Sequence, residues 1–176
     1  AALRFDGEKN MLQTTVDISP AAAPVVTVIA VFSSATEEDR PLRKLYGDDS
    51  GGYDRAAGLD ERAGPEKNYK VFTGRGVEPY FALKANETYV TVDQYTATDF
   101  SGWVNGAAML TKVPAGWEDA LPNLYIGGTG TSYHEPWQGD IAEMIVYGRV
   151  LTDDERIQIE DYLGAKYGVA INRAAQ

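Results

Sequence analysis

The chain contains no cysteine, which excludes disulfides, thiolate metal sites and cysteine nucleophiles. It contains a single histidine, His134, so zinc sites built from several histidines are excluded as well. It also lacks a long apolar run. The longest, residues 21–32, is interrupted by Pro24 and Thr27 and is too short to span a bilayer. We therefore expect no membrane insertion.

Positive charge is scarce. The chain has 16 Lys and Arg against 26 Asp and Glu, a formal net charge of -10. Between residues 71 and 147 the only basic side chains are Arg75, Lys84 and Lys112. Such a surface repels phosphate backbones and anionic membranes, and it disfavours sulfated or uronic-acid ligands. We therefore expect no nucleic-acid partner.

The length of 176 residues is that of one ordinary domain, and 44% of the residues are hydrophobic. A chain of this size can bury a stable hydrophobic core without disulfides or structural metal ions. We find no internal repeat, low-complexity tract or linker, which predicts a single domain over residues 1–176. The sequence begins Ala1-Ala2 without Met or an apolar leader. We expect a processed protein or an excised module.

Short runs of β-branched and aromatic residues alternate with Gly, Pro, Asn and Asp, a rhythm typical of an all-β sandwich. Residues 36–68 are the least regular, and we expect long loops there. The candidate strands are Met11–Val16, Val25–Ser33, Leu42–Tyr46, Tyr69–Thr73, Tyr80–Lys84, Tyr89–Thr96, Gly102–Val104, Ala108–Lys112, Asn123–Gly127 and Asp140–Tyr147.

Two of these patterns carry particular information. Residues 89–95 place Tyr89, Thr91, Asp93 and Tyr95 on one face of a strand and residues 90, 92 and 94 on the other. A strand with two apolar-leaning faces belongs inside a layered sandwich. The pair Asn105-Gly106 favours the positive φ angles of a type I′ hairpin turn, so the segments on either side should pair antiparallel.

One segment predicts a helix. Thr152 and Glu155 have the spacing of a capping box, and Gly168 is a typical stop. The apolar face expected to pack on the sandwich comprises Ile159, Tyr162 and Leu163.

Both ends of the chain resemble one superfamily. The opening residues 3–12 (LRFDGEKNML) and the closing segments 124–128 (LYIGG), 137–151 (WQGDIAEMIVYGRVL), 152–156 (TDDER) and 162–168 (YLGAKYG) are similar to bacterial and phage laminin-G-like, concanavalin A-like lectin domains. The resemblance implies a two-sheet antiparallel jelly roll, an all-β sandwich, here with one C-terminal α-helix. It also implies the uses of that superfamily: glycan binding, adhesion, virion decoration and, in some branches, glycan cleavage.

The candidate ligand site is the Gly-rich segment 127–137, which carries Tyr133, His134, Glu135 and Trp137. Aromatic faces stack on sugar C–H surfaces, while hydroxyl and carboxylate groups bind sugar hydroxyls. Trp117 could add a second stacking surface. The alternative is that the tryptophans are packing residues, the usual place of Trp, and that His134 is an exposed loop residue.

Calcium is the one cofactor that the resemblance raises, because many members of the superfamily bind it. Asp48 and Asp49, with Asp54 close behind, could supply oxygen ligands. Their spacing does not match the EF-hand pattern, and an acidic loop is more often simply solvated. We leave the metal unassigned.

Catalysis is disfavoured. Glycosidase relatives carry Glu-x-Asp-x-x-Glu on one strand, a pattern absent here, and lyase relatives need Gln-x-His, where this chain has Ser132 before His134. The leading hypothesis is a non-catalytic module that binds a neutral glycan or surface polysaccharide, in an extracellular, cell-surface or virion setting. The alternatives are a structural or virion module without glycan binding, or a divergent glycan-cleaving enzyme.

Overall fold

The computed structural model describes residues 1–51, 53–117, 120–130 and 135–173. It is a β-sandwich of two antiparallel six-stranded sheets with a C-terminal helix α1 (Asp153–Tyr167), which confirms the expected fold class. The strands are β1 (Leu3–Asp6), β2 (Leu12–Gln13), β3 (Val26–Ser34), β4 (Arg43–Gly47), β5 (Ala56–Leu59), β6 (Tyr69–Phe72), β7 (Val77–Phe81), β8 (Thr88–Tyr95), β9 (Asp99–Val104), β10 (Ala107–Pro114), β11 (Tyr125–Ile126) and β12 (Gln138–Tyr147).

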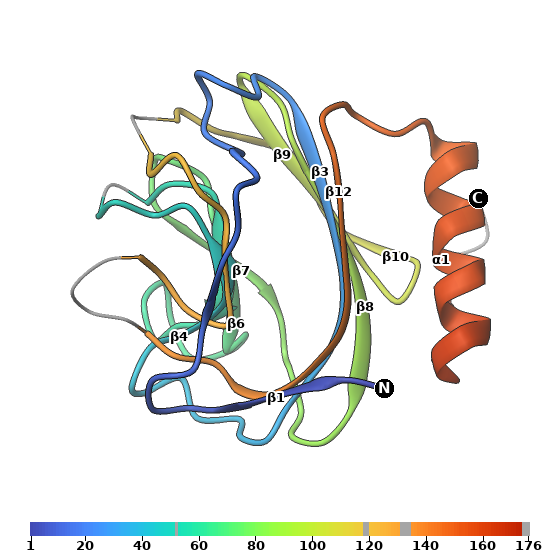
Figure 1. The fold of residues 1–176 in the computed structure, drawn as a ribbon. Coiled ribbons are helices and arrows are strands. Elements are labelled where there is room, and N and C mark those ends of the chain that lie inside the picture. The colour runs from blue at the N-terminus through green and yellow to red at the C-terminus, as the bar shows by residue number, and fades with distance from the viewer. Residues whose placement is uncertain (52, 118–119, 131–134, 174–176) are drawn as a thin grey trace.

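The two sheets differ in what covers them. One has the order β1-β12-β3-β8-β9-β10, and α1 lies along its outer face; we call it the helix-side sheet (Figure 1). The other, β2-β11-β4-β5-β6-β7, is the loop-side sheet, and it lies on the side of the molecule away from α1. The main core fills the space between the sheets, and a second, smaller cluster lies beneath α1.

Strand β8 is buried on both faces, as its alternation predicts. Tyr89 and Tyr95 point into the main core between the sheets. Val90 and Val92 point the other way and pack in the cluster beneath α1. A strand covered on both faces needs apolar residues on both, and this explains the pattern in residues 89–95.

A carboxylate sits at the centre of the main core. Asp93 on β8 is fully buried and accepts hydrogen bonds from the hydroxyls of Tyr46 (2.6 Å) and Tyr80 (2.7 Å) on the loop-side sheet. The Tyr46 hydroxyl is also 2.7 Å from that of Tyr95. Burial raises the pKa of Asp93 to about 6, although the two tyrosine donors oppose that shift. The two sheets are therefore joined through one buried carboxyl group.

The hairpin prediction is confirmed between β9 and β10. Val104 pairs with Ala107 across a two-residue turn, and Asn105 (φ 48°) and Gly106 (φ 85°) both have positive φ angles, as a type I′ turn requires. The Asn105 side chain also accepts a hydrogen bond from the Val90 N–H, 2.8 Å away, which ties the turn to β8.

Helix α1 begins and ends as predicted. Thr152 and Glu155 form a complete capping box, and Gly168 ends the helix in the left-handed conformation at φ 69°. Leu163 is buried and Ile159 packs beside it, but Tyr162 is 58% exposed. Including Tyr162 in the packing face was wrong, because the helix turns that position toward solvent.

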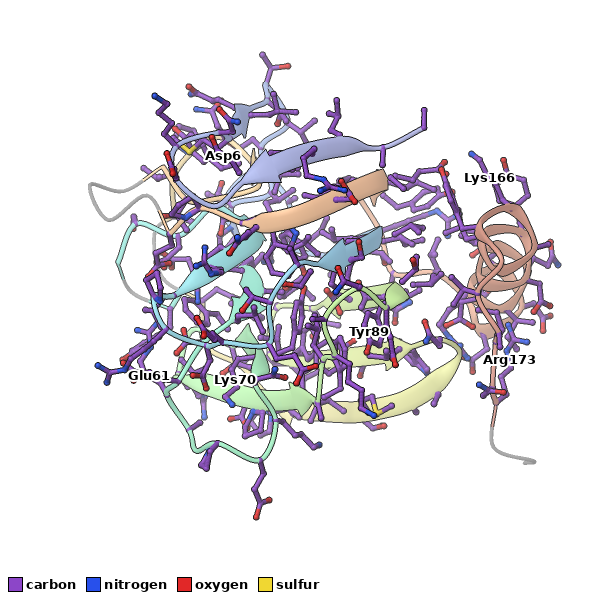
Figure 2. The ribbon with its side chains drawn as sticks, turned by 90° about the horizontal axis from the view of Figure 1, so that it is seen from below. Asp6, Glu61, Lys70, Tyr89, Lys166 and Arg173 are labelled. Carbon is purple, nitrogen blue, oxygen red and sulfur yellow. The ribbon has the colours of Figure 1, made fainter. Side chains whose placement is uncertain are left out.

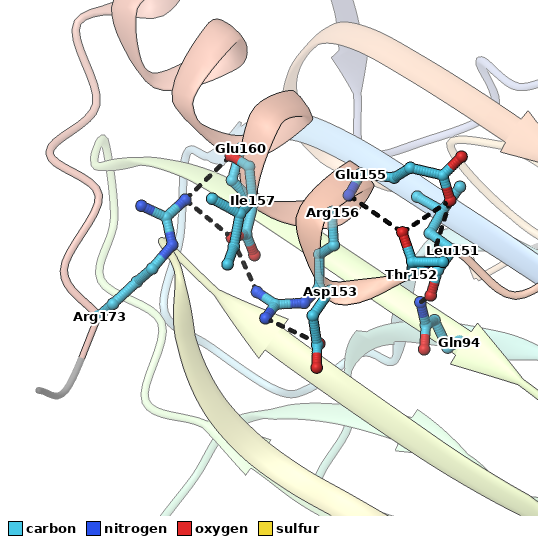
Figure 3. A network of polar contacts seen from close by, with 9 residues as sticks. All are labelled: Gln94, Leu151, Thr152, Asp153, Glu155, Arg156, Ile157, Glu160 and Arg173. Carbon is cyan, nitrogen blue, oxygen red and sulfur yellow. Dashed lines mark hydrogen bonds and ion pairs between the residues drawn. The ribbon is translucent and has the colours of Figure 1, made fainter. Parts of the chain in front are cut away.

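Polar contacts also hold α1 on the sheet (Figure 3). The guanidinium of Arg156 lies 4.4 Å from the centre of the Trp103 ring and donates to Glu160 at 2.9 Å. Arg173, beyond the helix, donates to the same carboxylate, and the Gln94 amide donates to the Leu151 carbonyl. The contacts of Arg156 with Trp103 on β9 and of Gln94 on β8 with Leu151 join the start of the helix to the helix-side sheet, whereas those of Glu160 lie within the helix and the segment that follows it.

Three expectations need correction. The segment expected to be loops contains β5, whose sequence Ala-Ala-Gly-Leu has no β-branched or aromatic residue to reveal it. The strands expected over residues 11–16 and 123–127 shrink to the two-residue β2 and β11.

No helix among the described residues combines the length and apolar character needed to cross a bilayer.

The buried Asp93 predicts an unusual pH dependence. Its pKa is raised on folding from 3.8 to about 6, so its stabilising contribution is complete below pH 3.8 and is lost as the pH rises through 6. Asp93→Asn replaces the carboxyl group with an amide that is neutral at every pH. Relative to wild type, the variant should gain about 3 kcal/mol of unfolding free energy between about pH 4 and pH 7, at ~1.4 kcal/mol per pKa unit.

Urea denaturation at several pH values between 4 and 7 measures this difference. Glu66→Gln, a change at an exposed carboxyl group, is the control and should show no such trend. A difference between Asp93→Asn and wild type that stays constant with pH would contradict the raised pKa.

Candidate functional site

The predicted ligand segment, residues 127–137, is described on both sides of residues 131–134. Tyr133 and His134 lie outside the described residues. The chain is described again from Glu135, whose carbonyl accepts the Lys44 N–H of β4 at 2.8 Å, and Pro136 forms an isolated bridge with Lys44. The backbone of Glu135 is therefore held alongside β4 of the loop-side sheet.

Trp137 lies in the core rather than in a binding loop. Its exposed fraction is 0%, and its ring meets Phe32 and Tyr69 edge-on at centroid distances of 5.5 and 6.3 Å. Its indole N–H donates to the Ser33 carbonyl at 3.3 Å. Core side chains cover the ring, so no sugar can stack on it in this structure. This position corresponds to the alternative in which Trp137 is a packing residue.

Trp117 is half-buried at another place in the sandwich. Its ring packs edge-on against Tyr95 at 5.3 Å, the Arg55 guanidinium lies 5.3 Å from its centre, and its indole N–H donates to the Thr96 carbonyl. These neighbours differ from those of Glu135. Of the sequence-predicted site residues that the structure describes, Glu135 is the one that joins a new group of polar side chains.

That group stands on the outer face of β4, β5 and β6, and we call it the outer-face cluster. Tyr69 and Val71 of β6 point into the core, so the alternate residue Phe72 points outward. Figure 2 shows Lys70 and Glu61 on this side of the molecule, away from the helix that carries Lys166. The members of the outer-face cluster are Lys44, Tyr53, Asp60, Arg62, Phe72 and Glu135.

A buried ion pair is the centre of the outer-face cluster. The Lys44 ammonium is fully buried, 2.7 Å from Asp60 Oδ2 and 3.9 Å from the centre of the Phe72 ring. Arg62 binds Asp60 through both Nε (2.8 Å) and Nη2 (2.5 Å). The Oε2 atom of Glu135 lies 4.0 Å from the Lys44 ammonium. Two cations and two carboxylates thus share one site.

The charged groups of the outer-face cluster differ in how fully they are paired. Burial lowers the pKa of Lys44, although the carboxylates of Asp60 and Glu135 oppose it. Burial would raise the pKa of Asp60, but Arg62 and Lys44 outweigh it and the pKa falls below its usual value. Burial raises the pKa of Glu135, and its Oε2 atom is buried without a hydrogen-bond partner. Glu135 is therefore the carboxyl group with hydrogen-bonding capacity to spare.

Tyr53 places an aromatic ring at the exposed side of the outer-face cluster. The side chain is 37% exposed, its ring meets Phe72 edge-on at 5.6 Å, and the Arg62 guanidinium is 5.4 Å from its centre. Tyr53 (φ 63°) and Glu135 (φ 37°) both have positive φ angles, which non-glycine residues adopt at a cost. Strained backbone of this kind gathers at functional sites.

The acidic residues considered for calcium lie beside the outer-face cluster and are buried. Asp48, Asp49 and Asp54 are 0%, 8% and 1% exposed, so the expectation of a solvated acidic loop is wrong. Both carboxylate oxygens of Asp48 and Oδ1 of Asp54 lack a hydrogen-bond partner. No group of three or more His, Cys, Asp or Glu in the described ranges is arranged to hold a metal ion.

Most of the outer-face cluster was missed at the level of sequence. A signal was available in the predicted strand 42–46, which contains the charged residues Arg43 and Lys44 where a buried strand should be apolar. Asp60 and Arg62 lie in a loop, as expected, but their position next to β4 depends on β5, which was not recognised.

Comparison with known proteins shows a shared fold. No family model matches the sequence, and neither does any curated protein. The structure is similar to Trypanosoma rangeli sialidase in complex with the inhibitor DANA (TM-score 0.63, 17% identity, 90% of this chain and 27% of that chain). It is also similar to the CBM40 of Ruminococcus gnavus IT-sialidase (0.55, 18%, 90% and 98%) and to a proposed carbohydrate-binding protein from Bacteroides ovatus (0.65, 18%, 89% and 46%). This chain thus spans about a quarter of the sialidase chain.

The position of Trp137 yields a prediction. Trp137→Ala should lower the free energy of unfolding by about 3–5 kcal/mol, because it opens a large cavity in the core. Trp137→Phe refills most of that space and should leave glycan binding unchanged. Urea denaturation and binding assays on the folded variants measure the two effects. If a folded Trp137→Phe protein no longer binds a glycan that wild type binds, the indole contributes to the ligand site after all.

Proposed function

We propose that this chain is a non-catalytic module that binds a neutral glycan at the outer-face cluster. The observation that carries the proposal is the exposed ring of Tyr53 beside the guanidinium of Arg62, whose side chain is 38% exposed. A ring face can stack on the apolar side of a sugar, while charged groups next to it exchange hydrogen bonds with sugar hydroxyls. The fold shared with a CBM40 and a proposed carbohydrate-binding protein supports the proposal.

The charge balance supports a neutral ligand. Lys44 and Arg62 are matched by Asp60 and Glu135, so the outer-face cluster offers no excess positive charge for a carboxylated or sulfated sugar. The chain as a whole carries a formal charge of -10, which further disfavours anionic ligands. The setting we propose for such a module is extracellular, on a cell surface or on a virion.

The state of Asp60 supports binding rather than cleavage. Glycoside hydrolysis uses two carboxyl groups that reach the sugar from opposite sides. Asp60 is fully buried, and each of its oxygens already accepts two hydrogen bonds from Lys44 or Arg62. It has no free lone pair for a substrate or a water, so Glu135 has no carboxylate partner within the outer-face cluster.

The ring of Tyr53 gives the direct test. Tyr53→Ala should weaken binding of a glycan found by array screening by about tenfold or more, as expected for losing ~1.4 kcal/mol of stacking. Tyr53→Phe keeps the ring and should retain most of the affinity. Tyr162→Ala, which removes an exposed ring on α1, is the matched control. Titration calorimetry measures all four proteins.

Equal affinity in wild type and a folded Tyr53→Ala protein would remove the outer-face cluster as the ligand site. Absence of binding to any glycan, from folded protein, would remove the proposed function itself.

A second candidate function, a structural module that associates through an apolar surface, is favoured by one observation. The exposed side chains of Leu3 and Leu12 line an apolar pocket of about 350 Å³ between the sheets, with Phe5, Ile126 and Met144. Exposed apolar patches mark contact surfaces. If this one joins two copies of the chain, Leu12→Ser should shift sedimentation from dimer to monomer. A wild-type protein that stays monomeric at high concentration would dismiss it.

A further inference from the structure

We propose that the ligand of the outer-face cluster is a chain of several neutral sugars, which continues from Arg62 over residues 62–67 to the edge of the sandwich formed by β7 and β10. The inference rests on the proposed function and extends it. It assigns a second binding region to the same ligand, and it predicts that long oligosaccharides bind more tightly than short ones.

Three hollows meet at this edge, where both sheets end. The first, of about 530 Å³, lies between residues 63–67 and Pro79 of β7. The second, of about 590 Å³, is lined by β7, the start of β8 and the β9–β10 hairpin, including the exposed side chain of Met109. The third, of about 280 Å³, includes residues 82–84. Glu66 lines all three hollows, so we treat them as one feature and call it the edge groove.

A loop joins the outer-face cluster to the edge groove. Lys70 lies on the same outward face of β6 as Phe72 of the outer-face cluster, two residues and therefore about 7 Å away. Its ammonium donates to the carbonyl of Gly64 at 2.8 Å and to that of Lys67. These bonds hold residues 62–67 over β6. The loop therefore gives a fixed surface between the two regions.

An aromatic residue also lies at the far end of this path. Tyr89 lines the largest of the three hollows; its hydroxyl donates to Glu87 at 2.9 Å and accepts the Lys84 N–H at 3.0 Å. Figure 2 shows Glu61, Lys70 and Tyr89 in that order across the molecule, which is the direction from the outer-face cluster to the edge groove. Apolar surface with hydroxyl and carboxylate groups beside it is suited to sugars.

The edge groove offers unpaired charged side chains but no excess of positive charge. Its charged lining residues are Glu37, Asp39, Glu66, Lys67, Lys84 and Glu87. Among the described residues none of them forms an ion pair within 4.0 Å. Such groups can exchange hydrogen bonds with sugar hydroxyls. Four carboxylates against two ammonium groups disfavour an anionic chain, so we assign a neutral one.

The two edge strands disfavour a peptide in the same place. A peptide binds a sheet edge by continuing its ladder of backbone hydrogen bonds. Pro79 lacks an N–H in the middle of β7, and the register of β10 shifts twice against β9. Lys112 of β10 also has a positive φ of 49°. Both ladders are interrupted, so the edge groove presents side chains rather than regular backbone.

Oligosaccharide length provides the test. Neutral oligosaccharides of glucose, xylose, mannose and galactose, each as disaccharide and hexasaccharide, are titrated into wild type by calorimetry. For the sugar that binds, the hexasaccharide should bind about twentyfold or more tightly than the disaccharide, because it reaches both regions. A site confined to the outer-face cluster would give at most about fivefold, from the number of overlapping positions that a longer chain offers.

Two matched double variants locate the gain. Glu66→Ala/Lys67→Ala removes the side chains at the meeting point of the hollows and keeps the backbone carbonyl that Lys70 binds. It should reduce the gain with length to about fivefold or less. Glu8→Ala/Lys9→Ala removes a second exposed Glu-Lys pair, after β1, and should keep the full gain. A gain that survives Glu66→Ala/Lys67→Ala would overturn the edge groove.

Amide chemical shifts in NMR spectra show the contact directly. The hexasaccharide should shift the amide of Met109, whereas the disaccharide should not. The amide of Tyr162, on the exposed side of α1, should stay in place with both sugars.

The outcomes separate this inference from the proposed function. If the two sugar lengths bind within about fivefold of each other, or if the hexasaccharide leaves Met109 unmoved, the edge groove is overturned while the outer-face cluster stands as a glycan site. If folded protein binds none of the oligosaccharides, both are overturned.

Discussion

The central constraint on this fold is a carboxyl group buried between two sheets. Asp93 is fully buried and accepts hydrogen bonds from Tyr46 and Tyr80, so the position of β8 fixes those of β4 and β7. On β4 this has a direct consequence. Leu45 and Tyr46 both enter the core, and the register shifts between Lys44 and Tyr46 where β4 pairs with β5. The irregularity turns Lys44 to the outer face, where the outer-face cluster forms.

The charges of the outer-face cluster are costly for a structure that needs only stability. A buried ion pair such as Lys44–Asp60 loses most of its Coulomb energy to desolvation, and apolar residues of similar volume often serve as well. The strained backbone at Tyr53 and Glu135 adds to that cost. Because these costly features add little to the stability of the fold, we expect them to serve ligand contacts. This agrees with the location we propose for glycan binding.

The sequence predicts those parts of the structure that depend on local rules. The alternation of β8, the Asn105-Gly106 turn and the capping box at Thr152 each depend on residues within one short segment. The outer-face cluster depends on contacts between distant segments, such as Lys44 with Glu135, and on a strand irregularity that no residue pattern announces. The choice between ligand and packing roles for Trp137 stayed open for the same reason, since its partner carbonyl lies on β3.

The outer-face cluster is balanced by its own charges and by the loop beside it. Asp49, on the loop that carries Tyr53, interacts with Lys44 and Arg62, so the charge of the outer-face cluster depends on that loop. Arg62 binds Asp60 through two nitrogen atoms and lies 5.4 Å from the centre of the Tyr53 ring, so one guanidinium both neutralises the buried carboxylate and contacts the exposed ring. A balanced cluster beside an aromatic ring is the arrangement that a neutral sugar requires.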